Sequence, residues 1–298
     1  MSAAVELSVV VVNWNGGEGL LRCLEAAIAA LEGRRCELWL VDNASHDGSA
    51  EGAAARFPEA RLLRNSRNLG FARAANQALS RSAGQCTLLL NPDVVLTREA
   101  LDKLLAALAS DPRIGIVGGP SVDRAGQPAP GFEPSYPGAR RREVTGAHGS
   151  LCRDVAWVSA ACLLARREMI AEVGLLDEGF FMYYEDVDWC FRARQAGWRV
   201  VWVPEAVVAH ELGGSARLVP AAETARRAAA SRLHFWRKYY GQARALGLRA
   251  GMAGSAALGA LWRLGPAVLS RAARERVGCE LARLGVALSG PAREETQI

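Results

Sequence analysis

The sequence predicts an α/β fold that ends in a helical tail. Over residues 8–117, short β-branched runs alternate with segments whose apolar residues recur at helical spacing, which is the pattern of βαβ units in a parallel sheet. Half of the 298 residues are hydrophobic and 22% are charged, which is typical of a packed core and not of a disordered chain. We therefore expect one large domain over residues 1–214 and a tail over residues 215–298.

The expected elements follow in chain order. We expect strands at 8–12, 37–41, 61–64, 86–90 and 114–117, with helices at 19–31, 49–57, 71–82 and 98–110. Residues 118–154 are rich in Gly, Pro and Arg and are expected to form a long irregular excursion. Regular structure resumes at 155–165, followed by helices at 167–173 and 186–195 and strands at 180–184, 199–203 and 207–210. Pro220 is expected to open a further helix and Gly241 to close it.

Charge and cysteine content exclude several classes of protein. The net charge is +5, but residues 211–298 hold 14 Arg and Lys against six Glu, whereas the remainder holds 22 basic and 25 acidic residues. No nucleic-acid reader motif is present, so the basic tail favours an anionic lipid surface over nucleic acid. The seven cysteines include no C-x-x-C pair, which indicates a reducing cytoplasm and no zinc or redox site. The apolar run 7–12 follows Glu6 rather than basic residues, so we expect a strand, not a signal peptide or membrane span.

The tail segment 246–269 is apolar and rich in small residues, but Arg249, Arg263 and Pro266 interrupt it. This pattern favours an interfacial helix over a membrane span. The aromatic and basic run 235–240 also suits a lipid headgroup boundary. Helices that pack back on the domain, or on a second subunit of a homodimer, remain an open alternative.

Short polar clusters follow three expected strands: Asn-Trp-Asn-Gly at 13–16, Asp-Asn-Ala-Ser at 42–45 and Asn-Pro-Asp at 91–93. The carboxyl ends of parallel strands meet at one edge, where ligands bind. Asn and Asp side chains can bond the base edge or ribose of a nucleotide, and Asp93 is placed to bind Mg²⁺ or Mn²⁺ through oxygen. Taken singly, residues 42–49 could be a capped turn and residues 91–93 an Asx-Pro turn.

Three carboxylates, Glu185, Asp186 and Asp188, crowd the start of the expected helix 186–195. They could complement the helix dipole, with Asp188 paired to Arg192 at i, i+4. Crowded carboxylates also raise one another's proton affinity, which suits a general base, and Asp186 is the candidate. His210 follows the apolar run 207–209. A lone His at a strand end is commonly structural, so a ligand role depends on its neighbours.

Taken in order, these motifs resemble the inverting family 2 glycosyltransferases of the GT-A fold, which include bacterial rhamnosyltransferases and galactofuranosyltransferases. The resemblance covers about residues 7–241 and rests on V-V-N-W-N-G at 11–16, V-D-N-A-S-x-D-G-S at 41–49, N-x-G-F-A-x-A-x-N at 68–76, L-N-P-D at 90–93 and F-x-Y-x-E-D-V-D-x-C at 181–190. It implies a Rossmann-like mixed sheet flanked by helices, a nucleotide-sugar donor and a metal-dependent transfer that inverts the anomeric centre.

The resemblance also implies individual roles. The donor is expected to contact Asn13, Asp42, Asn43, Arg67, Asn68 and Asn91. Asp93 and His210 are expected to bind the cation, and Asp186 to accept the proton of the acceptor. Glu185, Asp188 and Trp157 are expected to contact the acceptor or to support the base. For Arg67 and Asn68, a cap to the following helix is an equal alternative. Asn91 replaces the usual first acid of the metal motif, which predicts a cation site with fewer carboxylates. Ala160 stands where relatives tend to carry glycine, so acceptor specificity does not transfer.

The resemblance favours deoxythymidine diphosphate (dTDP) rhamnose as donor, with uridine diphosphate (UDP) sugars next. The expected acceptor is a glycan or lipid-linked saccharide of the cell envelope, at the inner face of the cell membrane. Two alternatives stay open. A sugar nucleotidyltransferase would be expected to carry a basic residue in its first phosphate loop, which residues 13–18 lack. A catalytically silent nucleotide-sugar-binding protein has little need for Asp93, Asp186 and His210 together.

Overall fold

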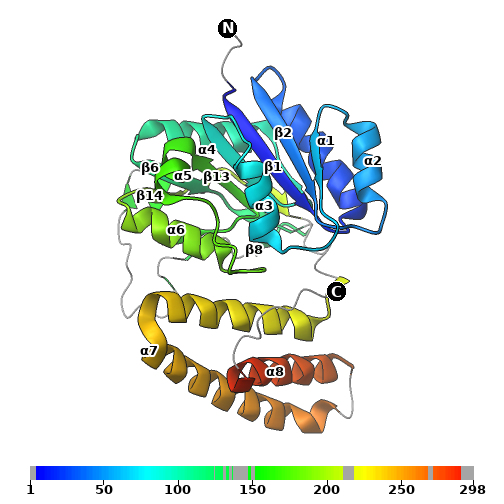
Figure 1. The fold of residues 1–298 in the computed structure, drawn as a ribbon, viewed down its shortest axis with the longest axis vertical. Coiled ribbons are helices and arrows are strands. Elements are labelled where there is room, and N and C mark those ends of the chain that lie inside the picture. The colour runs from blue at the N-terminus through cyan, green and yellow to red at the C-terminus, as the bar shows by residue number, and fades with distance from the viewer. Residues whose placement is uncertain are drawn as a thin grey trace. The chain divides into compact units, whose positions relative to one another are not determined.

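The computed structural model describes residues 5–123, 125–129, 132–133, 136, 147–148, 152–210, 218–267 and 271–289. The contacts divide the chain into two compact units, which are described separately (Figure 1). The first comprises residues 1–177 and 186–216, and the second comprises residues 178–185 and 217–298.

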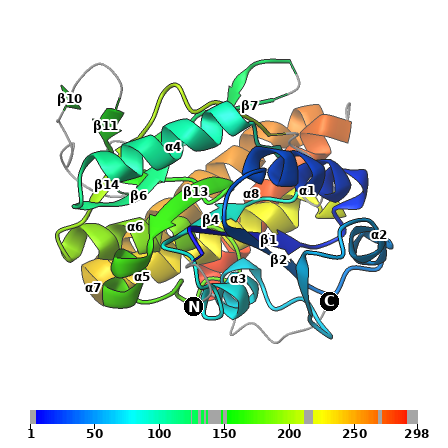
Figure 2. The same cartoon turned by 90° about the horizontal axis from the view of Figure 1, so that it is seen from above.

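A mixed sheet in the order β10-β11-β14-β6-β13-β4-β1-β2-β3 runs through the first unit (Figure 2). Its strands are β1 (Leu7–Asn13), β2 (Cys36–Asp42), β3 (Arg61–Arg64), β4 (Cys86–Leu90), β6 (Ile114–Gly118), β10 (Ala147–His148), β11 (Cys152–Asp154), β13 (Cys162–Arg166) and β14 (Arg199–Trp202). Helices α1 (Gly17–Leu31) and α4 (Arg98–Ser110) cover one face, and α3 (Phe71–Leu79) and α5 (Arg167–Val173) cover the other. The remaining helices are α2 (Ser49–Arg56), which packs beside α1, and α6 (Glu185–Gln195).

β1, β2 and β4 are parallel neighbours, and every residue of β1 is buried because helices cover both faces of this part of the sheet. Asn13 lies opposite Asp42 in the β1–β2 ladder, and Val11 lies opposite Leu90 in the β1–β4 ladder. The carboxyl ends of these three strands therefore meet at one edge of the sheet, as the sequence predicted.

Beyond β4 the sheet is mixed, because β13 enters between β4 and β6 and runs antiparallel to both. Leu163 lies opposite Leu89 on one side and Gly118 on the other. A Cβ atom at Gly118 would lie 2.8 Å from Val158 Cβ, so the close approach here requires glycine. The mixed sheet that the family resemblance implied is confirmed.

A second sheet joins β5 (Val94–Val95), β15 (Val208–His210), β7 (Ser121–Val122) and β8 (Pro128–Ala129) in that order. β15 is antiparallel to β5, with His210 opposite Val94. This register brings His210 next to Asp93, the residue that precedes β5. A two-stranded pair, β12 (Trp157–Val158) and β9 (Phe132–Glu133), completes the described strands. The excursion 118–154 is thus less irregular than expected where it is described, and its other residues lie outside the described part.

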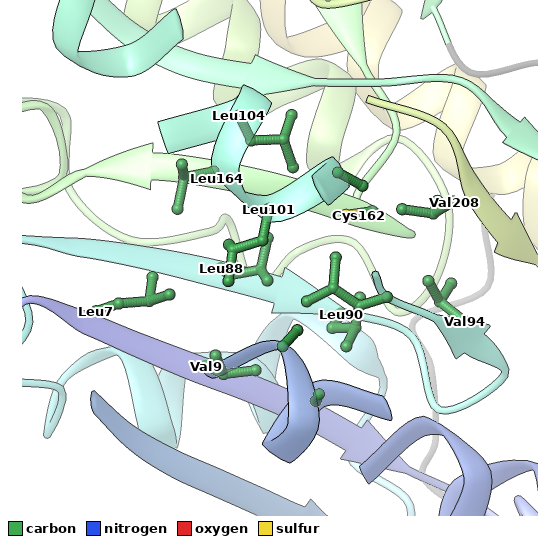
Figure 3. Packing of buried hydrophobic residues seen from close by; sticks show 14 of the residues in the cluster. Leu7, Val9, Leu88, Leu90, Val94, Leu101, Leu104, Cys162, Leu164 and Val208 are labelled. Atoms are coloured by element: carbon green, nitrogen blue, oxygen red, sulfur yellow. The ribbon is translucent and has the colours of Figure 1, made fainter. Parts of the chain in front are cut away.

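Leucines of β4 and α4 form the centre of the core beneath the strand ends (Figure 3). Leu88, Leu90, Leu101 and Leu104 are at most 1% exposed. Truncation of a buried leucine to alanine costs about 2–5 kcal/mol, so this packing holds the end of β4, and with it the loop that starts at Asn91, in one place.

The prediction of a strand at 180–184 is wrong. Residues 181–184 form bends, and the whole segment belongs to the second unit. Tyr183 and Tyr184 have φ angles of 70° and 69°, which lie in the left-handed region and are incompatible with an extended strand.

The second unit consists mainly of α7 (Ala221–Ala267) and α8 (Arg271–Ser289), which pack along each other. α7 begins directly after Pro220, and its first half ends at Gly241, whose φ of 80° and ψ of 170° are not helical, as expected; a second helical half then continues to Ala267. Leu233, Val286 and Met252 pack together, so both halves of α7 contact a common apolar cluster with α8. Within the described helices, none combines the length and apolar character that crossing a membrane requires.

Candidate functional site

Asn13 ends β1 with its side chain fully buried and ties together the loops that follow β1 and β2. Its amide nitrogen lies 3.1 Å from Asp42 Oδ1, 3.0 Å from Ser45 Oγ and 2.9 Å from Ser49 Oγ. Its amide oxygen accepts the backbone N–H of Gly16 at 3.1 Å. Asn13 is therefore engaged with protein partners and shapes the loops. Among the residues that the structure describes, Asp42 Oδ2 accepts only a long bond of 3.4 Å, from the N–H of Ser45.

Asn43 and Asn68 organise the loop before α3. Asn43 Nδ2 donates to Asn68 Oδ1 at 2.8 Å, and Asn43 Oδ1 accepts the backbone N–H of Leu69 at 2.9 Å. Asn68 Oδ1 also accepts the N–H of Gly70, the residue before α3, at 2.9 Å. Arg67, by contrast, is exposed and makes no hydrogen bond or ion pair with any residue that the structure describes, so its guanidinium is available to a ligand.

Asp93 and His210 form a close pair at the end of β4. Asp93 Oδ1 and His210 Nε2 are 3.0 Å apart, with side chains 15% and 12% exposed. Adjacent ligands of an octahedral divalent ion with bonds of about 2.1 Å lie about 3 Å apart, so this spacing fits two positions around one ion. Nowhere in the described residues do three His, Cys, Asp or Glu side chains gather as a metal cluster. Further ligands would have to include other groups, such as substrate oxygens.

The N-terminus of α1 approaches the same place. A Cβ atom at Gly19 would lie 3.6 Å from the carbonyl oxygen of Pro92 and 3.9 Å from Asp93 Cβ, so a glycine allows this approach. The N–H of Gly17 donates to Asp47 Oδ2 at 2.8 Å, which joins the loop after β2 to the start of α1. Helix N-termini carry unpaired N–H groups and partial positive charge, which suit a diphosphate.

Asp186 is the second residue of α6, and backbone N–H groups hold its carboxylate. Oδ2 accepts the N–H of Ala160 at 3.0 Å, and Oδ1 accepts the N–H of Val187 at 2.8 Å. Burial raises the pKa of the Asp186 carboxyl above its usual range, and the two N–H groups lower that pKa again in part. A carboxylate with a raised pKa is a stronger base than one in water.

One turn connects this carboxylate to the metal motif. Ala160 and Ala161 form the turn before β13. While Ala160 donates its N–H to Asp186, Ala161 accepts the N–H of Asn91 at 2.9 Å through its carbonyl oxygen. The candidate base and the Asn91-Pro92-Asp93 segment are thus linked through two adjacent residues.

The other acids of the 185–188 cluster are buried. Asp188 is fully buried and its Oδ2 lies 2.8 Å from Arg192 Nε, which is the i, i+4 pair weighed from the sequence. Arg192 also donates to the carbonyl oxygens of Val173 and Leu175, so the pair anchors α6 to the end of α5. Glu185 is 6% exposed.

Trp157 lies on β12, close in sequence to this turn. Its indole Nε1 is buried and has no hydrogen-bond partner within the described part of the chain. A buried donor of this kind is costly to leave unsatisfied. Its expected contact with the acceptor stays a prediction.

The family model described as glycosyltransferase like family 2 matches residues 4–241. The chain belongs to this family. An N-acetylglucosaminyl-diphospho-decaprenol L-rhamnosyltransferase of Mycobacterium tuberculosis is 34% identical to this glycosyltransferase in an alignment of 254 residues that covers 74% of this chain and 80% of that protein. A low-salt glycan biosynthesis hexosyltransferase of Haloferax volcanii is 26% identical over 208 residues, covering 64% of this chain and 62% of that protein.

Solved structures show the same fold. A mannosyltransferase from Pyrobaculum calidifontis, in complex with GDP-Man and Mn²⁺, matches with a TM-score of 0.61 at 17% identity, covering 99% of this chain and 89% of that chain. GalNAc-T7 with UDP, GalNAc and Mn²⁺ matches with a TM-score of 0.56 at 18% identity, covering 79% of this chain and 51% of that chain. These likenesses confirm the GT-A fold of the glycosyltransferase.

Two groups of this glycosyltransferase's loops received no role from the sequence. Asp47 Oδ1 accepts both the N–H and the hydroxyl of Ser49, which itself lies against Asn13. Gly16 is equally constrained, because a Cβ atom there would lie 2.5 Å from Asn13 Oδ1. The D-G-S motif contains Asp47 and the N-W-N-G motif contains Gly16, so both residues lie within motifs visible in the sequence, although only the structure shows which atoms are in contact.

Proposed function

We propose that this glycosyltransferase moves a sugar, with rhamnose as the first candidate, from a nucleotide diphosphate to a hydroxyl of a lipid-linked saccharide, with inversion. The observation that carries the proposal is the Ala160–Ala161 turn. Ala160 donates a hydrogen bond to the carboxylate of Asp186, whose pKa is raised, and Ala161 accepts one from Asn91, which begins the segment that leads to Asp93. Rhamnose and a polyprenyl-linked acceptor are favoured because the Mycobacterium tuberculosis relative carries them in its name.

The strand-end loops suit the donor. Asp42 Oδ2 and the amide of Asn91 remain available for the nucleoside and sugar, since Asn91 uses its backbone rather than its side chain for bonds to described residues. Arg67, which has no partner among the described residues, offers a cation for a phosphate, and the N-terminus of α1 adds partial positive charge. Asn13, Asn43 and Asn68 contribute by holding these loops in position.

Asp93 and His210 would hold a divalent cation, Mg²⁺ or Mn²⁺, together with oxygens of the donor. Bound there, the cation would supply charge neutralisation for the leaving diphosphate. Their 3.0 Å separation supports this assignment.

Asp186 removes the proton from the acceptor hydroxyl as its oxygen attacks the anomeric carbon. The bond from that carbon to the diphosphate breaks on the opposite face, and its electron pair leaves with the diphosphate. One displacement of this kind inverts the anomeric centre. Burial of Asp186 assists the proton transfer, because it raises the pKa of the carboxyl toward the pKa of the acceptor hydroxyl that loses the proton.

The second unit supports a contact with membrane. It exposes large apolar side chains at Leu218, Leu246, Leu258, Leu281 and Leu288. Together with the basic charge of residues 211–298, these suit the anionic inner face of a cell membrane, where a cytoplasmic enzyme would meet a lipid-linked acceptor. We expect the protein to co-sediment with vesicles that contain phosphatidylglycerol and not with neutral phosphatidylcholine vesicles. Absence of binding to either, together with a dimer in light scattering, would instead favour self-association through these surfaces.

A donor panel tests the function. The purified protein is incubated with dTDP-, UDP- and GDP-sugars, each with Mn²⁺, with Mg²⁺ or with a chelator, and release of the nucleotide diphosphate is measured with and without a short prenyl-diphosphate N-acetylglucosamine. We expect dTDP-rhamnose to be consumed fastest, with the acceptor and a cation both required for full rate. Turnover of no sugar nucleotide would favour the silent binding protein. Formation of a sugar nucleotide from a sugar phosphate and a nucleoside triphosphate would indicate the nucleotidyltransferase.

A further inference from the structure

Residues 180–184, which lead directly into the helix that carries Asp186, pack against the first half of α7. Ser231 Oγ donates a hydrogen bond to the carbonyl oxygen of Met182 at 2.8 Å. The ring of Tyr184 lies against Phe235, with centroids 5.8 Å apart, and Phe235 is fully buried. The first half of α7 thus contacts both the backbone and a side chain of the segment.

Two further contacts hold the start of the segment. The ring of Phe180, 1% exposed, meets His234 edge to face at 4.6 Å between centroids. The guanidinium of Arg227 lies 4.8 Å from the centroid of the Phe181 ring. Glu223 accepts the Nε–H of Arg227 at 2.7 Å and so orients it over that ring.

The residues of α7 that contact residues 180–184 lie on one face of the helix. Residues 227, 231, 234 and 235 are separated by four, three and one positions, which is the spacing of a single helical stripe. The segment that they contact contains two consecutive left-handed residues, Tyr183 at φ 70° and Tyr184 at φ 69°. Non-glycine residues keep such a conformation only where their surroundings over-determine it. The helical stripe supplies those surroundings.

We propose that the first half of α7 is a positioning element for the base of the transfer reaction. Ser231, Arg227 and Phe235 hold residues 180–184 in the backbone conformation that leads directly into α6 and Asp186. The three act through residues 180–184, so they are positioning residues. The inference rests on the proposed function of Asp186 as base.

The expected effect is on turnover. A displacement of about 1 Å in a positioned group can cost a factor of about 10² in rate, and loss of one of several contacts should allow a smaller displacement. We therefore expect Ser231→Ala to lower kcat by roughly tenfold. The affinity for dTDP and the KM for the donor should stay within about twofold of the wild type, because the donor loops follow other strands. Ser231→Thr keeps the hydroxyl and should restore most of kcat.

The chain offers matched controls. Ser255 also lies on α7 and donates its hydroxyl to a carbonyl oxygen, that of Met252 at 3.1 Å, so Ser255→Ala repeats the chemical change away from the segment. Arg226 bonds Glu223 as Arg227 does, but only Arg227 lies over Phe181. Arg227→Gln should therefore lower kcat severalfold more than Arg226→Gln.

Kinetics with dTDP-rhamnose and the prenyl-diphosphate acceptor, and calorimetry with dTDP, decide the matter. Wild-type turnover in Ser231→Ala would overturn the proposal, as would a loss of kcat that Ser231→Thr does not restore or that is matched by an equal loss of dTDP affinity. These outcomes differ from failure of the proposed function, in which the wild type itself transfers no sugar or Asp186→Asn remains fully active.

Discussion

Replacing Asn13 with alanine should destabilise the first unit and weaken nucleotide binding together. The side chain is fully buried, accepts the N–H of Gly16 and donates to the carboxylate of Asp42. A buried N–H left without a partner costs about 1–3 kcal/mol, and a lost bond to a charged group costs about 1.5–3 kcal/mol. Ser45 and Ser49 retain other partners, so their share is small. The expected loss is about 3–5 kcal/mol in the free energy of unfolding.

Urea and thermal denaturation measure this loss. Since 1 kcal/mol shifts Tm by about 2–4 °C in a domain of this size, Tm should fall by about 6–20 °C. Calorimetry with dTDP should show weaker binding, because the loop at 42–49 loses its anchor. Asn15 provides the control. Its side chain makes one bond, to the N–H of His46, at an exposed site, and its φ of 52° suits glycine, so Asn15→Gly should cost less than about 1 kcal/mol. A loss below 1 kcal/mol for Asn13→Ala, or an equal loss for Asn15→Gly, would refute the reasoning.

Three other changes separate the cation site, the structural ion pair and the buried base. Asp93→Ala should remove the Mn²⁺-dependent part of dTDP binding measured by calorimetry, and His210→Ala should reduce that part less, because a neutral ligand supplies less charge. Affinities for dTDP equal to those of the wild type in both variants would exclude the pair from the cation site. Arg192→Ala removes the guanidinium beside the fully buried Asp188 and should lower the free energy of unfolding in urea by about 3–5 kcal/mol. Lys103→Ala, at the exposed i, i+4 pair with Glu99, should lower it by less than about 1 kcal/mol, and similar losses for the two variants would contradict this contrast. Because burial raises the folded-state pKa of Asp186 above its unfolded value of about 3.9, the ionised carboxyl reduces the free energy of unfolding as pH rises through and above that value. Asp186→Asn should therefore be more stable than the wild type at pH 7 and equally stable near pH 3, and a stability difference that does not change with pH would disprove the raised pKa.

Local pattern was enough to give the bounds of several elements. The bounds of β3, β4, α4 and α5 agree with the prediction at both ends. Thr97 accepts the N–H of Ala100 and caps α4, a signal that is written in the adjacent residues. The meeting of Asn13 and Asp42 also followed from sequence, since parallel strands of equal length place their ends together.

Contacts between distant residues were beyond that reasoning. β13 enters the sheet between two strands that precede it in the chain, and nothing in residues 162–166 specifies its neighbours. The aromatic run 180–184 favoured a strand, but its backbone bends and it packs against α7, about 50 residues later. The bond from Ala160 to Asp186 is likewise non-local, and it changes what the sequence alone said of Asp186 by giving its carboxylate a fixed orientation.

The most direct test is the turnover of Asp186→Asn. The substitution preserves the shape of the side chain and keeps one amide oxygen, which can accept the N–H of Ala160 or that of Val187, but it removes the basic group. A positioned base contributes a factor of about 10² to 10⁴ in rate, so kcat for transfer from dTDP-rhamnose should fall by that factor while dTDP affinity stays unchanged. Turnover within a few-fold of the wild type would contradict Asp186 as the base, and with it the account of the site.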